Sequence, residues 1–172
     1  MVDLLQLLND SYNNVWIYML LAFGYAILVA LILPVPIEIA FLKPLIEGNW
    51  GLLVGTSIAI AAGKTIGAYL IFIFGLNVEG SVRKWSDRWR VAAWVVKKAE
   101  LFVEKTGVTG LYILLSIPAM SDTIPIYVYS IFNEAGKALE RNMFLIANFL
   151  AALNRVAIVG AAWYITRYLL NV

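Results

Sequence analysis

Four ionisable side chains interrupt otherwise apolar stretches of this sequence, and their types suit proton or ion chemistry. Two are carboxylates, Glu38 and Asp122, and two are cations, Lys64 and Arg155. A charge in hydrocarbon is costly and persists where it pairs or faces a polar space. Because the four charges sum to zero (+2 and −2), we expect them to meet in one central polar cavity, where pairing offsets the cost of burial. The alternative places both carboxylates at loop tips in interfacial water, unpaired.

Prolines stand beside both carboxylates. A proline removes one helical hydrogen bond and clashes with the preceding turn. Within a membrane, broken backbone is tolerated only where it faces protein or a water-filled cavity. We therefore expect a broken or re-entrant helix before Glu38 and another around Asp122. The alternative for the first is a helix that ends near Leu33, followed by an interfacial loop. The four prolines concerned are Pro34, Pro36, Pro118 and Pro125.

The composition predicts an all-α integral membrane protein. The 172 residues are 62% hydrophobic and 14% charged, with a mean hydropathy of +0.83, whereas soluble domains are about half apolar and about a quarter charged. The chain has no cysteine and no histidine. Disulfides, thiolate chemistry, haem, iron–sulfur clusters, His-containing zinc sites and a histidine base are thereby excluded. We expect no metal, no cofactor and no enzymatic activity.

The elements that would position these charges follow from the apolar runs. Residues 1–13 are expected to form a short amphipathic helix on the membrane surface. Residues 15–33 and 51–75 are each long enough to span about 30 Å of hydrocarbon. Residues 107–133 are apolar but broken, and 142–170 form the last helix. Lys64 lies halfway along the second of these spans.

Small residues recur at every fourth position of the second span. They are Gly51, Gly55, Ala59, Gly63 and Gly67. A ridge of this kind lets another helix approach closely, because lipid supplies no hydrophobic drive and packing must hold membrane helices together. The ridge would serve either a homo-oligomer or packing within the chain.

A basic segment separates the two apolar halves. It carries seven of the 13 basic residues and should be cytoplasmic, because positive charges concentrate on that side of membranes. Residues 77–106 are expected to form an amphipathic interfacial helix anchored by Trp85 and Trp89. Acidic residues are interleaved, which argues against nucleic-acid binding. The basic residues, within 83–105, are Arg83, Lys84, Arg88, Arg90, Lys97, Lys98 and Lys105.

The two halves can be superposed in sequence with one offset. Pro34 and Glu38 are four positions apart, as are Pro118 and Asp122. Lys64 follows the first carboxylate by 26 positions, and Asn148 follows the second by 26. Interrupted segments in matching places of two halves indicate a transporter site at a repeat interface. We therefore expect a single membrane domain over 1–172, with inverted-repeat-like halves at 14–76 and 107–170.

The chain resembles the DedA superfamily, also called the VTT or SNARE-associated Golgi protein family. The resemblance covers roughly residues 30–160. Its first half rests on the Pro-x-Pro-x-Glu run that ends at Glu38, on the helix segment AGKTIGAY, and on Gly75. Phe102, Gly107 and Ile117-Pro118 stand where family members carry a phenylalanine, a glycine and a second proline-broken segment.

This resemblance implies two re-entrant hairpins that face each other, and movement of lipid between leaflets. Bacterial relatives recycle undecaprenyl phosphate in dependence on proton motive force, and eukaryotic relatives scramble phospholipids. Glu38 matches the functional acid of the first hairpin. The family's arginines beside the second proline are replaced by Leu115 and Ser121, and its usual acid in the glycine-rich helix is not evident near Lys64. Lys64 and Arg155 would then have to supply the positive charge for a lipid phosphate.

Three functions follow as hypotheses. The first is a lipid transporter or scramblase in the cell membrane, for phospholipid or polyprenyl phosphate, with proton or ion coupling through Glu38 and Asp122. The second is an ion-coupled transporter of a small polar or cationic solute. The third is a non-transporting scaffold assembled through its small-residue ridge. The expected partners are membrane lipids, a lipid phosphate or small solute, and protons or cations.

Overall fold

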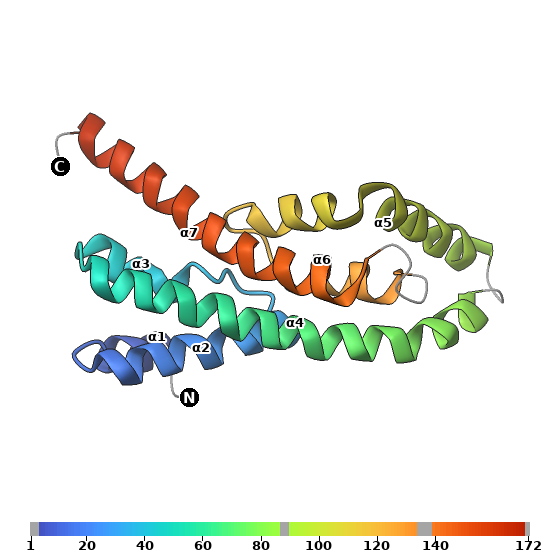
Figure 1. Cartoon of the computed structure of the whole chain (residues 1–172), viewed down its shortest axis with the longest axis horizontal. Helices are drawn as coiled ribbons and strands as arrows, with labels where there is room; N and C mark the ends of the chain where they lie inside the picture. Colours follow the sequence, from blue (N-terminus) through green and yellow to red (C-terminus); the bar gives the residue numbers. More distant parts are fainter. Residues whose placement is uncertain (1–3, 87–89, 134–138, 171–172) are drawn as a thin grey trace.

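The computed structural model describes residues 4–86, 90–133 and 139–170, and it contains helices and no strand over those residues. The prediction of an all-α chain is confirmed for this part. In chain order the helices are α1 (Leu4–Asp10), α2 (Val15–Leu31), α3 (Ile39–Ile46), α4 (Trp50–Ser86), α5 (Arg90–Ser116), α6 (Thr123–Ile131) and α7 (Arg141–Leu170) (Figure 1).

Two of these helices contain segments long and apolar enough to cross a membrane. They are Trp50–Gly75 in α4 and Arg141–Leu169 in α7. Their length and composition support the expected membrane character. α2 is shorter at 17 residues, or about 25 Å at 1.5 Å per residue. It ends at Leu31, slightly before the predicted 15–33 span.

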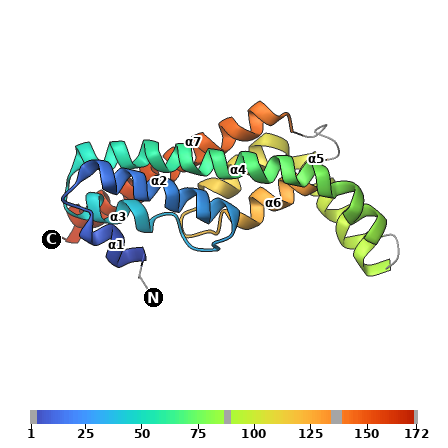
Figure 2. The ribbon, with the colours of Figure 1, turned by 90° about the horizontal axis from the view of Figure 1, so that it is seen from below.

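The long helices α4 and α7 run in opposite directions through the molecule (Figure 1). The α2–α3 pair lies toward the end where α4 begins, and the second half of α5 with α6 lies toward the other end. The segments that join α2 to α3 and α5 to α6 come together near the middle in both views (Figure 2). The two proline-containing breaks therefore lie side by side near the middle of the molecule.

The predicted interfacial helix over 77–106 has the wrong boundaries. Its first part continues α4 without interruption as far as Ser86, and its second part belongs to α5. The end of α4 and the start of α5 turn away from the other helices together (Figure 2). No proline occurs between Gly75 and Ser86, so nothing in the sequence stops the helix there. The side chains of Trp85 and Trp89, the expected anchors, lie outside the described residues.

The small-residue ridge of α4 packs against α2 within the chain. A Cβ on Gly63 would lie 2.3 Å from the Phe23 carbonyl oxygen, and one on Gly67 would lie 2.6 Å from the Ala30 Cβ. A Cβ on Gly55 would lie 3.0 Å from the sulfur of the flexible Met19 side chain, whereas one on Gly51 would be in ordinary contact with Asn49 Oδ1 at 3.9 Å. Glycine is required at the first two positions because the backbones approach too closely for any side chain. The ridge therefore serves internal packing at three of its four glycines.

Two apolar clusters lie on either side of the chain's buried charges. One gathers side chains of α4, α5, α6 and the first half of α7, including Phe72, Leu111 and Phe144. The other gathers α2, α3 and the start of α4 with Val156 and Val159 of α7. Along α4, Lys64 falls between residues of the two clusters, and so does Arg155 along α7. The charged centre is thus closed at both ends by close-packed hydrocarbon.

Candidate functional site

Three of the predicted site residues form a fully enclosed ion-pair triad. The Lys64 ammonium donates to Asp122 Oδ1 at 2.9 Å, and Arg155 Nη2 donates to the same oxygen at 2.9 Å. All three side chains are 0% exposed. One carboxylate oxygen therefore holds two cations from the two longest helices, α4 and α7.

Glu38 completes the cluster from the first break. Its Oε1 lies 3.6 Å from Arg155 Nε and accepts a hydrogen bond from the Ala119 backbone N–H at 2.9 Å. The Glu38 side chain is 10% exposed, compared with 0% for Arg155. Of the four charged side chains, Glu38 is thus the most exposed. The structure brings together all four side chains of the predicted charge network, but in a closed cluster rather than an open polar cavity.

Both carboxylates occupy the same place relative to a short helix. Glu38 is the residue before α3, and Asp122 is the residue before α6. Neither side chain caps its helix, so each is available to the central cluster. Both also lie at the positive end of a helix dipole, which favours a negative charge there. The local backbone therefore aims both carboxylates at the same centre.

The backbone of the first break is satisfied by side chains from neighbouring helices. Thr123 and Tyr127 of α6 donate from their hydroxyls to carbonyl groups at the end of α2. Tyr25 of α2 donates to a carbonyl within the break itself. Buried carbonyl groups without a donor are costly, so these hydroxyls make a broken helix tolerable here. The accepting carbonyls belong to Val29, Leu31, Leu33 and Pro36.

The second break contains a strained residue that Glu38 holds in place. Ala119 has a φ of 60°, the only positive value among described residues other than glycine. This conformation costs an L-residue with a side chain about 1–2 kcal/mol. The amide group of Ala119 donates to Glu38, while the carbonyl of the next residue, Met120, accepts from Arg155 Nη1 at 3.1 Å. The contacts with Glu38 and Arg155 thus hold this strained segment in place.

The prolines have two different roles. Pro34, Pro36 and Pro118 lie in the non-helical segments, as expected for breaks. Pro125 does not break a helix: it is the third residue of α6, in the first turn, where no intrahelical partner for an amide hydrogen exists. The prediction of Pro125 as a break is therefore wrong, and this residue helps to start α6.

Asn148 is buried but is not joined to the charges by a hydrogen bond. Its side-chain amide donates to the Phe144 carbonyl of its own helix at 2.8 Å. Its Oδ1 accepts no hydrogen bond from any described residue. The match in spacing with Lys64 therefore locates a buried polar group of α7, without placing it in the ion-pair cluster.

Several buried polar atoms around the cluster have no hydrogen-bond partner within the described part of the chain. They include the second oxygen of each carboxylate, a hydroxyl group at the end of α5 and a hydroxyl group of the second break. Such atoms are rare in proteins and usually have a functional or solvent explanation. The atoms are Glu38 Oε2, Asp122 Oδ2, Ser116 Oγ and Ser121 Oγ.

The contributions of Tyr25, Thr123 and Tyr127 were not anticipated from the sequence. Thr123 directly follows Asp122, and a hydroxyl beside a broken segment is a signal that could have found it. The two tyrosines had no such signal, because a tyrosine in an apolar run is ordinarily a packing residue. Comparison with known proteins adds no assignment: no family model, no curated protein and no solved structure matches the chain.

Proposed function

We propose that this chain is a multi-pass membrane protein of DedA type that moves a lipid between leaflets, coupled to protons through Glu38 and Asp122. The observation that carries the proposal is the enclosed cluster of Glu38, Lys64, Asp122 and Arg155 at the meeting of two helix breaks. Charges at this depth are expensive, and in membrane proteins they mark substrate paths and proton relays.

The architecture proposed is a pair of re-entrant hairpins, α2–α3 and α5–α6, that enter from opposite sides. Each half then has a broken segment, a carboxylate before a short helix, and a long helix that contributes one cation to the shared cluster. The opposite directions of α4 and α7 support an inverted relation between the halves. The basic charges within 83–105 favour the cytoplasmic side for the α4–α5 connection.

The charge balance of the cluster suggests how proton coupling would work. In the closed state the two cations and two carboxylates sum to zero. A proton on Glu38, the least enclosed member, would weaken its attraction for Arg155 and leave a net charge of +1. The two cations would then be available to a lipid phosphate, for which Lys and Arg are the usual donors. Release of the proton would restore the closed ion pairs and expel the phosphate.

A small cationic solute is the second candidate. Glu38 Oε2 and Asp122 Oδ2, which have no hydrogen-bond partner among the described residues, are acceptors, and acceptors suit a proton or a cation better than a phosphate. A scaffold is less well supported, because the glycines Gly55, Gly63 and Gly67 are occupied by contacts within the chain. A scaffold would also have no use for charges buried at this depth.

The test is lipid translocation in proteoliposomes at several pH values. Phosphatidylcholine with a fluorescent headgroup would be exposed to a membrane-impermeant quencher, with wild type, Glu38→Gln and Glu47→Gln compared. Glu47 lies at the exposed end of α3, so its variant controls for loss of a carboxylate outside the cluster. We expect fast quenching in wild type and Glu47→Gln, with at least a tenfold slower rate in Glu38→Gln.

Quenching in wild type no faster than in protein-free liposomes would refute movement of phospholipid. The same liposomes loaded with a pH-sensitive dye would then report proton movement driven by an added small cation. Proton movement under those conditions would favour the second candidate. Equal lipid rates in wild type and Glu38→Gln would remove Glu38 from the path.

A further inference from the structure

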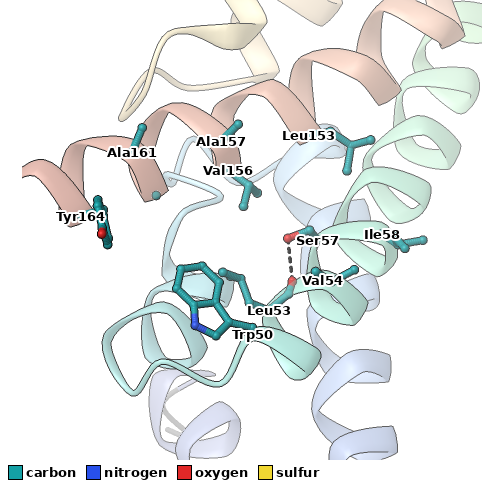
Figure 3. A pocket seen from close by; sticks show the side chains of 11 residues that line it. Trp50, Leu53, Val54, Ser57, Ile58, Leu153, Val156, Ala157, Ala161 and Tyr164 are labelled. Atoms are coloured by element: carbon teal, nitrogen blue, oxygen red, sulfur yellow. Dashed lines mark hydrogen bonds between the residues drawn. The ribbon is translucent and has the colours of Figure 1, made fainter.

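An apolar groove lies on the surface between the first third of α4 and the second half of α7, apart from the charge cluster. Its volume is about 620 Å³, within the range of roughly 300–1,000 Å³ usual for ligand pockets. Nearly all its lining atoms are hydrocarbon. The α4 side contributes Trp50, Leu53, Val54, Ser57 and Ile58, and the α7 side contributes Leu153, Val156, Ala157, Gly160, Ala161 and Tyr164 (Figure 3).

The groove offers no polar partner to a ligand along its length. Its one hydroxyl away from the rim, that of Ser57, donates to the Leu53 carbonyl at 2.6 Å, as the dashed line in Figure 3 shows. The two aromatic side chains with polar atoms, Trp50 and Tyr164, lie at one end of the groove. Such rings concentrate at the level of lipid headgroups, so this end marks the membrane surface.

The length of the groove corresponds to one leaflet. From Trp50 to Ile58 there are eight residues, or about 12 Å at 1.5 Å per residue. Half of a hydrocarbon core about 30 Å thick is about 15 Å. A straight hydrocarbon chain that enters beside the aromatic pair would therefore reach the end of the groove near the bilayer midplane.

A cation follows the groove-lining residues along α7. Arg167 is the basic residue of the last turn of α7, is exposed, and follows Tyr164 by three residues, which places both on the same side of the helix. Phosphate is the anionic group at this depth of a membrane. The cation would bind the phosphate of a phospholipid, the aromatic rim would lie at the level of its headgroup, and the apolar slot would hold an acyl chain.

We propose that this groove binds one phospholipid, with one acyl chain between α4 and α7 and the phosphate near Arg167. The site is separate from the charge cluster, because Arg155 lies on the opposite side of α7 from the groove-lining residues and is 0% exposed. The lipid would act as a wedge that holds the second half of α7 away from α4. The proposal does not depend on lipid transport.

Gly160 is the position from which the groove can be filled. A Cβ there meets only Leu45 Cδ1, at 3.8 Å, which is ordinary contact, so Gly160→Leu should fold and project into the slot. Ala162→Leu is the matched control, because Ala162 is exposed on α7 and does not line the groove. Arg167→Gln tests the mouth.

The measurement is native mass spectrometry of the full chain released from micelles that contain phosphatidylglycerol. We expect wild type and Ala162→Leu to retain one phosphatidylglycerol, and Gly160→Leu to retain it at least tenfold less. Arg167→Gln should bind about fivefold more weakly, the effect of one basic residue near a membrane surface. Equal retention in wild type and Gly160→Leu would overturn the proposal, as would a dimer of the chain that Gly160→Leu dissociates.

Photo-crosslinking provides a second measurement that needs no variant. Phosphatidylglycerol with a diazirine in one acyl chain would be irradiated with wild-type protein in bicelles, and the labelled peptides would be mapped. Adducts concentrated at 50–58 and 153–164 are expected. Adducts spread evenly over all exposed apolar helices would overturn the proposal, because they would describe bulk lipid.

Discussion

Asp122 is the residue whose removal should disturb the molecule most. Its Oδ1 accepts from both Lys64 and Arg155 at 2.9 Å, and all three side chains are 0% exposed. Asp122→Asn keeps nearly the same shape but removes the charge. The cluster would then hold two cations and one carboxylate, Glu38, with a net charge of +1. Both cations are 0% exposed, so neither can be hydrated without movement of the surrounding chain.

The expected destabilisation follows from the burial of these charges. Removing one partner of a buried ion pair costs about 3–5 kcal/mol, because the other charge stays buried and uncompensated. Lys64→Met alone should cost less, roughly 1–3 kcal/mol, since Asp122 retains Arg155. The double variant restores a net charge of zero with the Arg155–Glu38 pair. The double variant should therefore lose less free energy of unfolding than the two single variants lose in sum. The difference should be about 2 kcal/mol, within the range of coupling usual for contacting residues.

The assay is unfolding in mixed micelles titrated with sodium dodecyl sulfate, followed by circular dichroism. Glu47→Gln is the control, because a change at this exposed carboxylate should stay within about 0.5 kcal/mol of wild type. An unfolding free energy of Asp122→Asn equal to that of wild type would show that the Asp122 charge does not stabilise the buried cations. Simple addition of the effects of Lys64→Met and Asp122→Asn would show that the two side chains do not interact.

Two further predictions concern the backbone. Gly63→Ala should destabilise the protein by about 1–3 kcal/mol through overpacking, because the added Cβ would meet the Phe23 carbonyl. Gly24→Ala, whose added Cβ would have no atom within 4 Å, should be neutral or stabilise by up to about 1 kcal/mol. The same micelle titration compares the two variants, and equal effects would contradict the close approach of α2 and α4. Ala119→Gly should stabilise by roughly 1 kcal/mol, since glycine adopts a φ of 60° without the side-chain penalty. A loss of stability would show that Ala119 is not strained.

The juxtaposition of the four charges could be inferred from the sequence because burial leaves few alternatives. Lys64 lies too far from either end of its helix to reach water, so a carboxylate had to approach it. Which carboxylate approached could not be inferred. The nearer one in sequence, Glu38, pairs with Arg155, while Lys64 pairs with Asp122, 58 positions away. Pairing of this kind depends on how the two halves dock, and no local pattern encodes it.

Helix ends were less predictable than helix interiors. The apolar pattern located α2, the span in α4 and α7, because hydrocarbon length is a strong constraint. The polar stretch after Gly75 looked like a boundary, yet the helix continues to Ser86, since polarity does not interrupt backbone hydrogen bonds. The turn within α5 is different: Gly107 has a φ of 50° and ψ of −145°, a conformation that glycine alone adopts readily.

The two breaks depend on each other, and this dependence links the charge of Glu38 to the conformation of the second half. Side chains of α6, Thr123 and Tyr127, satisfy carbonyl groups that the first break leaves open. In return Glu38, from the first break, accepts the amide of strained Ala119 in the second. A carboxylate accepts such a bond more strongly than a neutral carboxylic acid does. Protonation of Glu38 would therefore weaken two contacts at once, those to Arg155 and to Ala119, and both lie in the half of the molecule to which Glu38 does not belong. In the proposed proton-coupled cycle, a proton on Glu38 would therefore act first on the contact between the two halves.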